Sequence, residues 1–371
     1  MAEEPSLHTF PIIATLAPFE VNQETITLNG EITKEGIDKI DSVGFVWTMK
    51  EFNSDSFSII REYIPNQFNR TIDSSFHEGF SYSIRAFARS NNRFIYGNEI
   101  EIISKGTNKS SWTLELGQTV IDGYGSSFGI SDSRYGYVLV QSGEMYIFDP
   151  FTKVLSYENK FPFGGDTGTR ITSIEHNGIL YFMSNNSRNL YTYANGGFKI
   201  KSQMPFNYSR YGNYYHGHAH DNKIYILNSH QSYSYDLEMD EWKRISSISE
   251  SSSYGGVSLG KDAFIICYDK SIWKFNPESN IWSKVATYPG KIDGLEPFVS
   301  FSYDRRIYFG LHGGETDLWS YDLVDEIWNR KRFPLKAIIE PAFFKLENKL
   351  YILNSGNKTK IISYDLANSS N

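Results

Sequence analysis

The sequence predicts an all-β protein in which an N-terminal β-sandwich is followed by a six-bladed β-propeller. Two observations carry this prediction. Apolar and polar residues alternate with a period of two in the first hundred residues, and a unit of 40 to 46 residues recurs six times in the rest of the chain. The predicted sandwich spans residues 8–105, a linker spans 106–110, and the propeller spans 111–366.

The first segment has the pattern of short strands rather than helices. Between residues 80 and 89 apolar and polar side chains alternate, as expected for a strand with one buried and one wet face. The wet face is expected to include Phe87, and the buried face consists of Phe80, Tyr82, Ile84, Ala86 and Ala88. An Asn91-Asn92 pair predicts a tight hairpin turn into the next strand. Several strands at this spacing favour a sandwich of roughly 100 residues.

Parts of this segment resemble a known module. The string from Tyr82 to Ala88, the Tyr96-Gly97 pair and the string 43–47 resemble fibronectin type III modules on surface lipoproteins of Gram-negative gut bacteria. The resemblance implies an Ig-like spacer without an active site. It also implies a location at the cell surface or in the periplasm, reached through a leader or lipid anchor upstream of the given chain.

The rest of the chain repeats one unit. A short string of aromatic or apolar residues ending in Asp or Asn recurs at 146–149, 233–236, 273–276, 319–322 and 362–365, and a degenerate copy at 191–194 ends in Ala194. The copies lie 45, 42, 40, 46 and 43 residues apart, which is the length of a four-stranded propeller blade. In three units a tryptophan follows the Asp or Asn by six residues: Trp242, Trp282 and Trp328.

The two ends of the repeat array are expected to meet. The last unit ends after Asp365 without a fourth strand, while residues 111–117 precede the first unit without a partner. An open propeller would leave unpaired sheet edges. We therefore predict that residues 111–117 supply the fourth strand of the last blade and close the ring.

Together these landmarks resemble kelch repeats over residues 111–366. The period and the outer tryptophans match the kelch pattern. The diglycine that kelch repeats carry after the second strand is kept only as Gly313-Gly314. The resemblance implies a kelch-like propeller.

Composition excludes several classes of function. The chain has 36 Lys and Arg against 43 Asp and Glu, and this net charge of −7 argues against nucleic acid as a partner. No apolar run approaches the roughly 18 residues of a membrane helix. The single Cys267 excludes internal disulfides and Cys-rich zinc sites, and phosphate-binding glycine motifs and GxSxG are absent. We expect a monomer that uses no cofactor and no metal.

A ring of polar and aromatic side chains is predicted where the innermost strands begin around the central channel. Counting back 11 or 12 residues from the apolar anchor of each second strand leads to Arg170, Tyr214, Tyr254, Glu296 and Glu340. An arginine and two carboxylates beside tyrosines suit a sugar, because hydroxyls bind to bidentate acceptors and sugar rings contact aromatic faces. The alternative is that these residues only start strands around a hydrated channel.

Two neighbouring motifs could extend this site. The aromatic segment 207–215 contains Arg210 and Tyr211, and such segments on a rigid scaffold often contact ligands, although 16% aromatic residues also produce clusters by chance. The string HGHAH places His216, His218 and His220 on one face of a strand. A metal would need a further ligand from a neighbouring blade, so histidines that pack between blades or line the channel are favoured instead.

We expect a non-enzymatic binding protein whose propeller contacts a glycan or a surface protein, because aromatic segments are dense and no catalytic constellation is evident. The alternative is a sugar mutarotase or epimerase resembling the kelch-type sialic acid mutarotase. In that case Glu296 or Glu340 would act as acid or base and Arg170 would clamp a substrate carboxylate. A structural role in a surface assembly is a third possibility, which an exposed apolar patch would favour.

Overall fold

The protein is all-β, as the sequence predicts. The computed structural model describes residues 9–21, 25–51, 54–60, 66–73, 76–107, 112–119, 121, 127–140, 142–162, 171–184, 187–206, 214–248, 252–292, 298–311, 315–332, 342–354 and 359–367. The chain divides into two compact units, Met1–Leu114 and Glu115–Asn371. In the described part of the chain, no helix is long and apolar enough to cross a membrane.

The first unit contains two antiparallel sheets, one ordered β1-β2-β5 and the other β4-β3-β6-β7, with β8 also paired to β6. Side chains from both sheets pack together, since the ring centroids of Phe45 on β3 and Phe68 on β5 lie 5.3 Å apart. The strands are β1 (Ile12–Val21), β2 (Thr25–Lys34), β3 (Ile40–Met49), β4 (Ser54–Ile60), β5 (Gln67–Ile72), β6 (Ser81–Ser90), β7 (Arg93–Tyr96) and β8 (Ile100–Ile103).

The β6 strand shows the predicted alternation with one exception. Its apolar set is buried, and Asn91 and Asn92 both adopt positive φ in the predicted hairpin turn. The expectation that Phe87 lies on a wet face is wrong, because Phe87 is only 2% exposed. Its ring centroid lies 5.3 Å from that of Phe94 and 6.1 Å from that of Tyr96, both on β7, and these rings cover it.

The same face of this sheet keeps several apolar side chains exposed. Phe57 and Ile59 on β4 lie in register with the β3 and β6 residues of that face, and Phe57 is 71% exposed. Phe94 and Tyr96 are also exposed. The patch belongs to the first unit.

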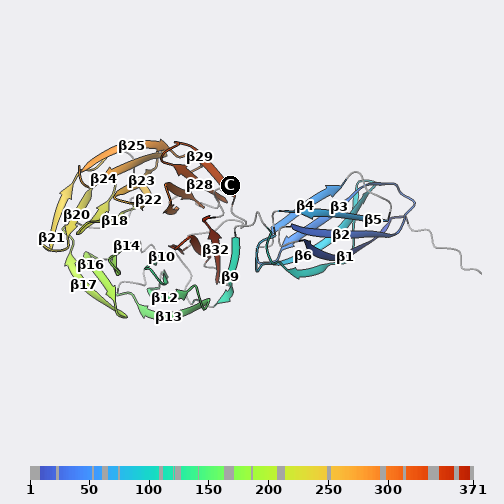
Figure 1. Cartoon of the computed structure of the whole chain (residues 1–371), viewed down its shortest axis with the longest axis horizontal. Helices are drawn as coiled ribbons and strands as arrows, with labels where there is room; N and C mark the ends of the chain where they lie inside the picture. The colour runs from blue at the N-terminus through green and yellow to red at the C-terminus, as the bar shows by residue number, and fades with distance from the viewer. Residues whose placement is uncertain are drawn as a thin grey trace, which may run out of the picture. The chain divides into compact units, whose positions relative to one another are not determined.

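The second unit consists, in its described residues, of six four-stranded sheets arranged around a ring, which is the arrangement of a β-propeller (Figure 1). The first strand of each sheet contacts the first strand of the next, and β30 contacts β10, so the ring is closed. The strands are β9 (Trp112–Thr119), β10 (Ser127–Ser131), β11 (Gly136–Val140), β12 (Glu144–Asp149), β13 (Val154–Lys160), β14 (Ile171–His176), β15 (Ile179–Ser184), β16 (Asn189–Ala194), β17 (Gly197–Gln203), β18 (His216–His220), β19 (Lys223–Leu227), β20 (Ser232–Asp236), β21 (Glu241–Ile245), β22 (Ser253–Leu259), β23 (Asp262–Cys267), β24 (Ser271–Asn276), β25 (Ile281–Thr287), β26 (Val299–Tyr303), β27 (Arg306–Gly310), β28 (Asp317–Asp322), β29 (Trp328–Arg332), β30 (Ala342–Leu346), β31 (Lys349–Asn354) and β32 (Thr359–Asp365).

The Asp or Asn at the end of each repeated string stabilises the turn that follows the third strand. Asp236 Oδ1 accepts hydrogen bonds from the backbone N–H groups of Glu238, at 3.1 Å, and Met239, at 3.0 Å. This is the local bond that makes Asp and Asn common in turns. The corresponding oxygen accepts a backbone N–H in the turns after Asp149, Asn276, Asp322 and Asp365.

The degenerate copy has a different turn. Ala194 pairs with Gly197 across a two-residue hairpin, and the central residues Asn195 and Gly196 both have positive φ. An Asn-Gly pair is the preferred sequence for this tight turn. The turn is so short that it contains no loop for an Asp or Asn side chain to stabilise. The loss of the Asp in this copy therefore has a local structural reason.

The repeated tryptophans lie directly across the ladder from the aromatic residue of the repeated string. Trp242 pairs with Tyr235 in the β20–β21 register, and their ring centroids lie 4.8 Å apart. Trp282 lies 4.9 Å from its partner Phe275, and Trp328 lies 5.0 Å from Tyr321. The constant spacing in the sequence thus comes from a turn of fixed length between two facing rings.

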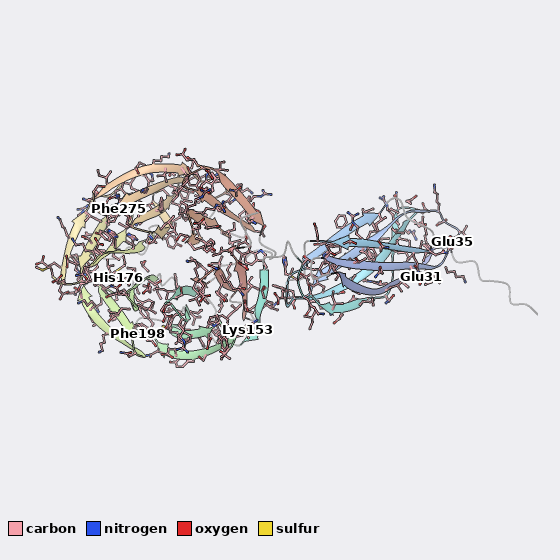
Figure 2. The ribbon with its side chains drawn as sticks, viewed as in Figure 1. Glu31, Glu35, Lys153, His176, Phe198 and Phe275 are labelled. Carbon is pink, nitrogen blue, oxygen red and sulfur yellow. The ribbon has the colours of Figure 1, made fainter. Side chains whose placement is uncertain are left out.

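The strand that precedes the first repeat, β9, forms the outer strand of the last sheet, next to β32. Its Glu115 side chain is 3% exposed and accepts a hydrogen bond from Ser363 Oγ on β32 at 2.7 Å. Lys349 Nζ lies 3.2 Å from one carboxylate oxygen, and Lys153 Nζ, from the neighbouring sheet, lies 3.0 Å from the other. Figure 2 labels Lys153. Glu115 therefore links the last sheet to the first.

This environment lowers the pKa of Glu115 below its ordinary value. Burial by itself would raise the pKa, but the hydrogen bond from Ser363 and the ammonium groups of Lys153 and Lys349 outweigh it. The ionised carboxylate is thus the form that the folded ring prefers. Its contribution to stability is complete above the ordinary glutamate pKa of about 4.3 and is lost as the pH falls through the lowered folded value.

We predict that Glu115→Gln lowers the free energy of unfolding by about 2 kcal/mol at pH 7, because charge-assisted hydrogen bonds to a buried group are lost. Urea unfolding followed by tryptophan fluorescence measures this. The gap to wild type should narrow as the pH falls below about 4, where the wild-type carboxylate also becomes protonated. Glu241→Gln, on an exposed position of β21, is the control. An equal loss in both variants, or a gap that does not depend on pH, contradicts the prediction.

Candidate functional site

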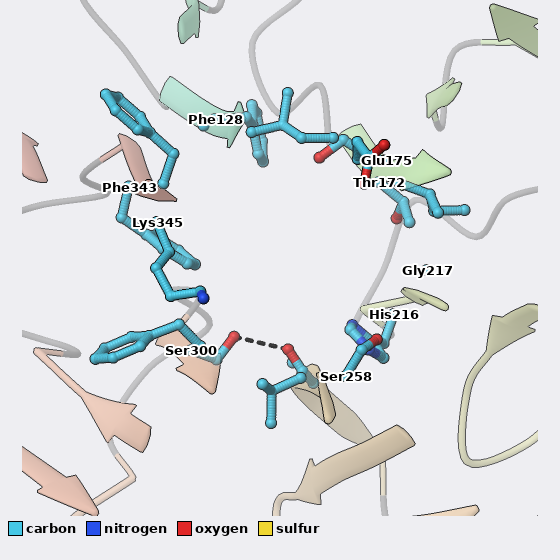
Figure 3. A pocket seen from close by; sticks show the side chains of 18 of the residues that line it. Phe128, Thr172, Glu175, His216, Gly217, Ser258, Ser300, Phe343 and Lys345 are labelled. Atoms are coloured by element: carbon cyan, nitrogen blue, oxygen red, sulfur yellow. Dashed lines mark hydrogen bonds between the residues drawn. The ribbon is translucent and has the colours of Figure 1, made fainter. Parts of the chain in front are cut away.

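The first strands of the six sheets line a cavity of about 420 Å³ at the centre of the ring (Figure 3). Each of β10, β14, β18, β22, β26 and β30 contributes side chains to its wall. Phe343 and Lys345 lie on the opposite side of the cavity from His216. A cavity of this volume accommodates a small ligand, and its wall combines aromatic rings with hydroxyl groups.

Hydroxyl side chains connect the first strands to one another. Each first strand has one edge without a ladder partner, so its carbonyl groups need other donors. Ser300 Oγ donates to the Gly256 carbonyl at 2.8 Å, and Ser302 Oγ donates to the Ser258 carbonyl at 2.6 Å. Two further bonds, from Thr172 to the Tyr215 carbonyl at 3.0 Å and from Ser131 to the Lys345 carbonyl at 2.5 Å, follow the same pattern.

Glycine permits the close approach of neighbouring first strands. A Cβ atom at Gly256 would lie 2.5 Å from Cγ of His216, and a Cβ atom at Gly217 would lie 2.1 Å from a side-chain carbon of Ile174. Neither contact is possible without displacement of the neighbour. These two glycines therefore seat the β14, β18 and β22 strands against one another at the wall.

Two histidines and a serine form a hydrogen-bonded chain in this wall. Ser258 Oγ lies 3.0 Å from His216 Nε2 and 2.9 Å from His218 Nδ1. His218 Nε2 lies 2.9 Å from the carbonyl oxygen of Lys261. His216 and Ser258 border the cavity, while His218 is buried behind them.

Burial keeps both imidazoles neutral. It lowers the pKa of His216 to about 3, with a smaller contribution from His218, and it lowers the pKa of His218 to about 4. The Lys261 carbonyl partly opposes the shift at His218. Both rings are therefore uncharged at neutral pH, and each carries a single N–H.

The charged side chains among the described lining residues are Glu175 and Lys345, which have opposite signs. Glu175 Oε1 accepts the backbone N–H of Gly178 at 2.8 Å, within the turn after β14. Burial lowers the pKa of Lys345, and its Nζ lies 6.0 Å from the centroid of the Tyr303 ring. The wall thus has no net formal charge from these residues.

Three predicted site residues line this cavity: Tyr214, His216 and Tyr254. The rings of Tyr214 and Tyr254 are stacked, with centroids 6.2 Å apart and an interplanar angle of 23°. The carbonyl of Tyr214 accepts hydrogen bonds from Asn228 Nδ2 and Ser253 Oγ, at 3.2 and 2.7 Å, which hold the start of β18 in place. Their role in binding stays a prediction. The other predicted site residues, Arg170, Arg210, Tyr211, Glu296 and Glu340, lie outside the described residues.

Sequence reasoning missed Ser258, Thr172, Ser300 and Lys345. One sequence pattern could have indicated that hydroxyl groups line the channel: small polar residues at alternate positions of a first strand, such as Ser300 and Ser302. Residues at alternate positions share one face of a strand. Lys345 had no such signal. It reaches the wall because β30 turns that face toward the channel.

The histidine string does not assemble a metal site in the described residues. There, no group of three or more His, Cys, Asp or Glu side chains lies close enough together to hold a metal ion. His218 and His220 stack with ring centroids 6.5 Å apart. Two imidazole nitrogens instead share one serine oxygen.

No protein-family model and no curated protein matches the chain. Among solved structures the chain is similar to YjhT, with 14% identity, a TM-score of 0.54, and coverage of 67% of this chain and 96% of YjhT. It is also similar to a structural genomics protein of unknown function from Bacteroides thetaiotaomicron VPI-5482. That match has 11% identity and a TM-score of 0.51, and it covers 97% of this chain and 100% of the other. At these identities the similarity shows the fold alone, and it fits a β-propeller.

We predict that the buried histidines weaken the fold in mild acid. The folded pKa of His218 lies below its ordinary value of about 6.5, so its stabilisation is complete above that pH and is lost as the pH falls toward 4. At pH 5 the loss amounts to about 2 kcal/mol for one such histidine. Between pH 7 and pH 5 the free energy of unfolding of His218→Gln, measured with urea, should therefore fall by about 2 kcal/mol less than that of wild type. His230→Gln, at an exposed position, should follow the wild-type pH dependence, and identical slopes in all three proteins contradict the prediction.

Proposed function

We propose that the protein is a non-enzymatic binding protein of the cell surface or periplasm, whose propeller holds a glycan in its central cavity. The observation that carries the proposal is the cavity of about 420 Å³, to which all six sheets contribute hydroxyl or aromatic side chains. Sugars need both kinds of contact, because their hydroxyls form hydrogen bonds and their ring C–H faces pack on aromatic rings.

We also propose a kelch-like, six-bladed propeller and an N-terminal fibronectin type III-like sandwich. The support for the first is the repeated set of a turn-stabilising Asp or Asn and a facing Trp, together with β9 as the fourth strand of the last sheet. The support for the second is the pair of antiparallel sheets whose side chains pack together in the first unit. In this proposal the first unit is a spacer that carries the binding unit.

The proposed site includes residues next to the described wall. Arg170 directly precedes Ile171, the first residue of β14, which lines the cavity. Glu296 and Glu340 each stand two residues before a described lining residue or strand, Phe298 and β30 respectively. Their sequence positions therefore favour one common mouth of the cavity, together with segment 207–213.

We predict that Tyr214→Ala weakens binding of the best ligand from a glycan array about tenfold, because the ring that stacks on Tyr254 is lost while the backbone bonds at this position remain. Tyr214→Phe should bind within about twofold of wild type. Tyr157→Ala, on the outer strand β13 where the side chain is 58% exposed, is the control. Calorimetric titration measures all three. Equal affinity of Tyr214→Ala and wild type would place the ligand elsewhere.

The alternative function is a sugar mutarotase or epimerase, in which Glu296 or Glu340 transfers protons and Arg170 holds a substrate carboxylate. Exchange spectroscopy by NMR on a bound sugar separates the two functions. A binding protein leaves the rate of anomer exchange unchanged. An enzyme accelerates it, and Glu296→Gln or Glu340→Gln then abolishes the acceleration without a matching loss of affinity.

A further inference from the structure

Several aliphatic hydroxyl groups of the cavity wall donate their hydrogens to the protein. Ser131, Thr172, Ser300 and Ser302 each donate to a backbone carbonyl, which can only accept. A hydroxyl has one hydrogen and two lone pairs. The three serine side chains therefore remain in the wall as hydrogen-bond acceptors rather than donors.

The same reasoning assigns the protons of the histidine chain. The Lys261 carbonyl only accepts, so the single N–H of neutral His218 is on Nε2 and its Nδ1 is a bare acceptor. Ser258 must then donate its hydrogen to His218 Nδ1. With that hydrogen used, His216 Nε2 must donate to Ser258 Oγ.

This assignment leaves His216 Nδ1 without a hydrogen. This nitrogen has no hydrogen-bond partner among the described residues. It is also not among the fully buried side-chain atoms that lack a partner, so part of its surface is accessible. His216 lines the cavity, and its ring packs against Gly256, which fixes its position. The lone pair of Nδ1 is therefore available to a ligand.

We propose that the cavity selects a neutral polyhydroxylated ligand, an uncharged sugar, and discriminates against the corresponding sugar acid. This inference rests on the proposed glycan-binding function and specifies its ligand class. The wall presents the hydroxyl oxygens of Ser131, Ser258, Ser300 and Ser302 and the bare His216 nitrogen as acceptors, and sugar hydroxyls supply the matching donors.

A carboxylate is a poor match for such a wall because it offers no hydrogen. In place of a hydroxymethyl group it would leave wall acceptors unpaired and would bring a charge out of water beside their lone pairs. Lys345 could attract it, but Glu175 in the same wall has the opposite charge. Discrimination between a sugar and its uronic acid therefore depends on the acceptor groups.

The proton assignment can be tested without any ligand. Two-dimensional ¹⁵N–¹H spectra that record the histidine rings distinguish the two neutral tautomers, and His216→Gln and His218→Gln assign the signals. We expect His216 and His218 both as neutral Nε2–H tautomers at pH 7. In Ser258→Ala, His216 should change to a mixture of tautomers, whereas Ser258→Thr, which keeps the hydroxyl, should restore the wild-type pattern. An Nδ1–H tautomer for His216 in the wild type overturns the inference.

Ligand selection is tested with three matched pairs: galactose and galacturonic acid, glucose and glucuronic acid, and mannose and mannuronic acid. In any pair that binds, we expect the neutral sugar to bind about tenfold more tightly than its acid. Ser258→Ala should reduce this ratio of affinities about fivefold. Ser246→Ala, whose hydroxyl bonds Asn280 away from the cavity, is the control. An acid that binds as tightly as its neutral partner overturns the inference. If no sugar binds but the tautomers are as expected, the proposed glycan-binding function is wrong, while the assignment of acceptor groups in the wall is confirmed.

Discussion

The rest of the second unit depends on the closure of the ring by β9. A strand from the start of the unit completes the sheet formed by its end, so both ends of the repeat array are held in one sheet. The buried Glu115 carboxylate extends this closure to the neighbouring sheet through Lys153. Because an acceptor with 3% exposure cannot be solvated by water instead, the three partners of Glu115 specify one register for β9.

Closure of the ring brings the free edges of the six first strands to the central channel. The character of the cavity wall follows from the groups that form hydrogen bonds with these edges. The free edge of each first strand exposes carbonyl groups that no ladder partner serves. Serine and threonine hydroxyls from the adjacent strand donate to them in several sheets. The bonds that hold neighbouring sheets together are thus the same bonds that make the cavity wall rich in acceptors.

In the histidine chain, too, bonds that hold the wall together also set which atoms remain as acceptors. His218 is anchored to a backbone carbonyl, and Ser258 bridges it to His216, which lines the cavity. Since burial keeps both rings neutral, this part of the wall offers the same hydrogen-bond pattern through the neutral pH range. The cost of this arrangement appears in the stability of the fold in mild acid, not in the binding chemistry.

By itself the sequence determined the all-β class, the repeat period and the pairing of residues 111–117 with the last repeat, because these follow from periods of two and of about forty residues. It did not show that Phe87 is covered, or that Ser258 and Lys345 reach the cavity. Only the tertiary structure decided these, because they depend on which strands from distant repeats become neighbours. The proton on His216 is the clearest case: it is set by a carbonyl on Lys261, 45 residues away in the chain, through His218 and Ser258, which lie on two different sheets.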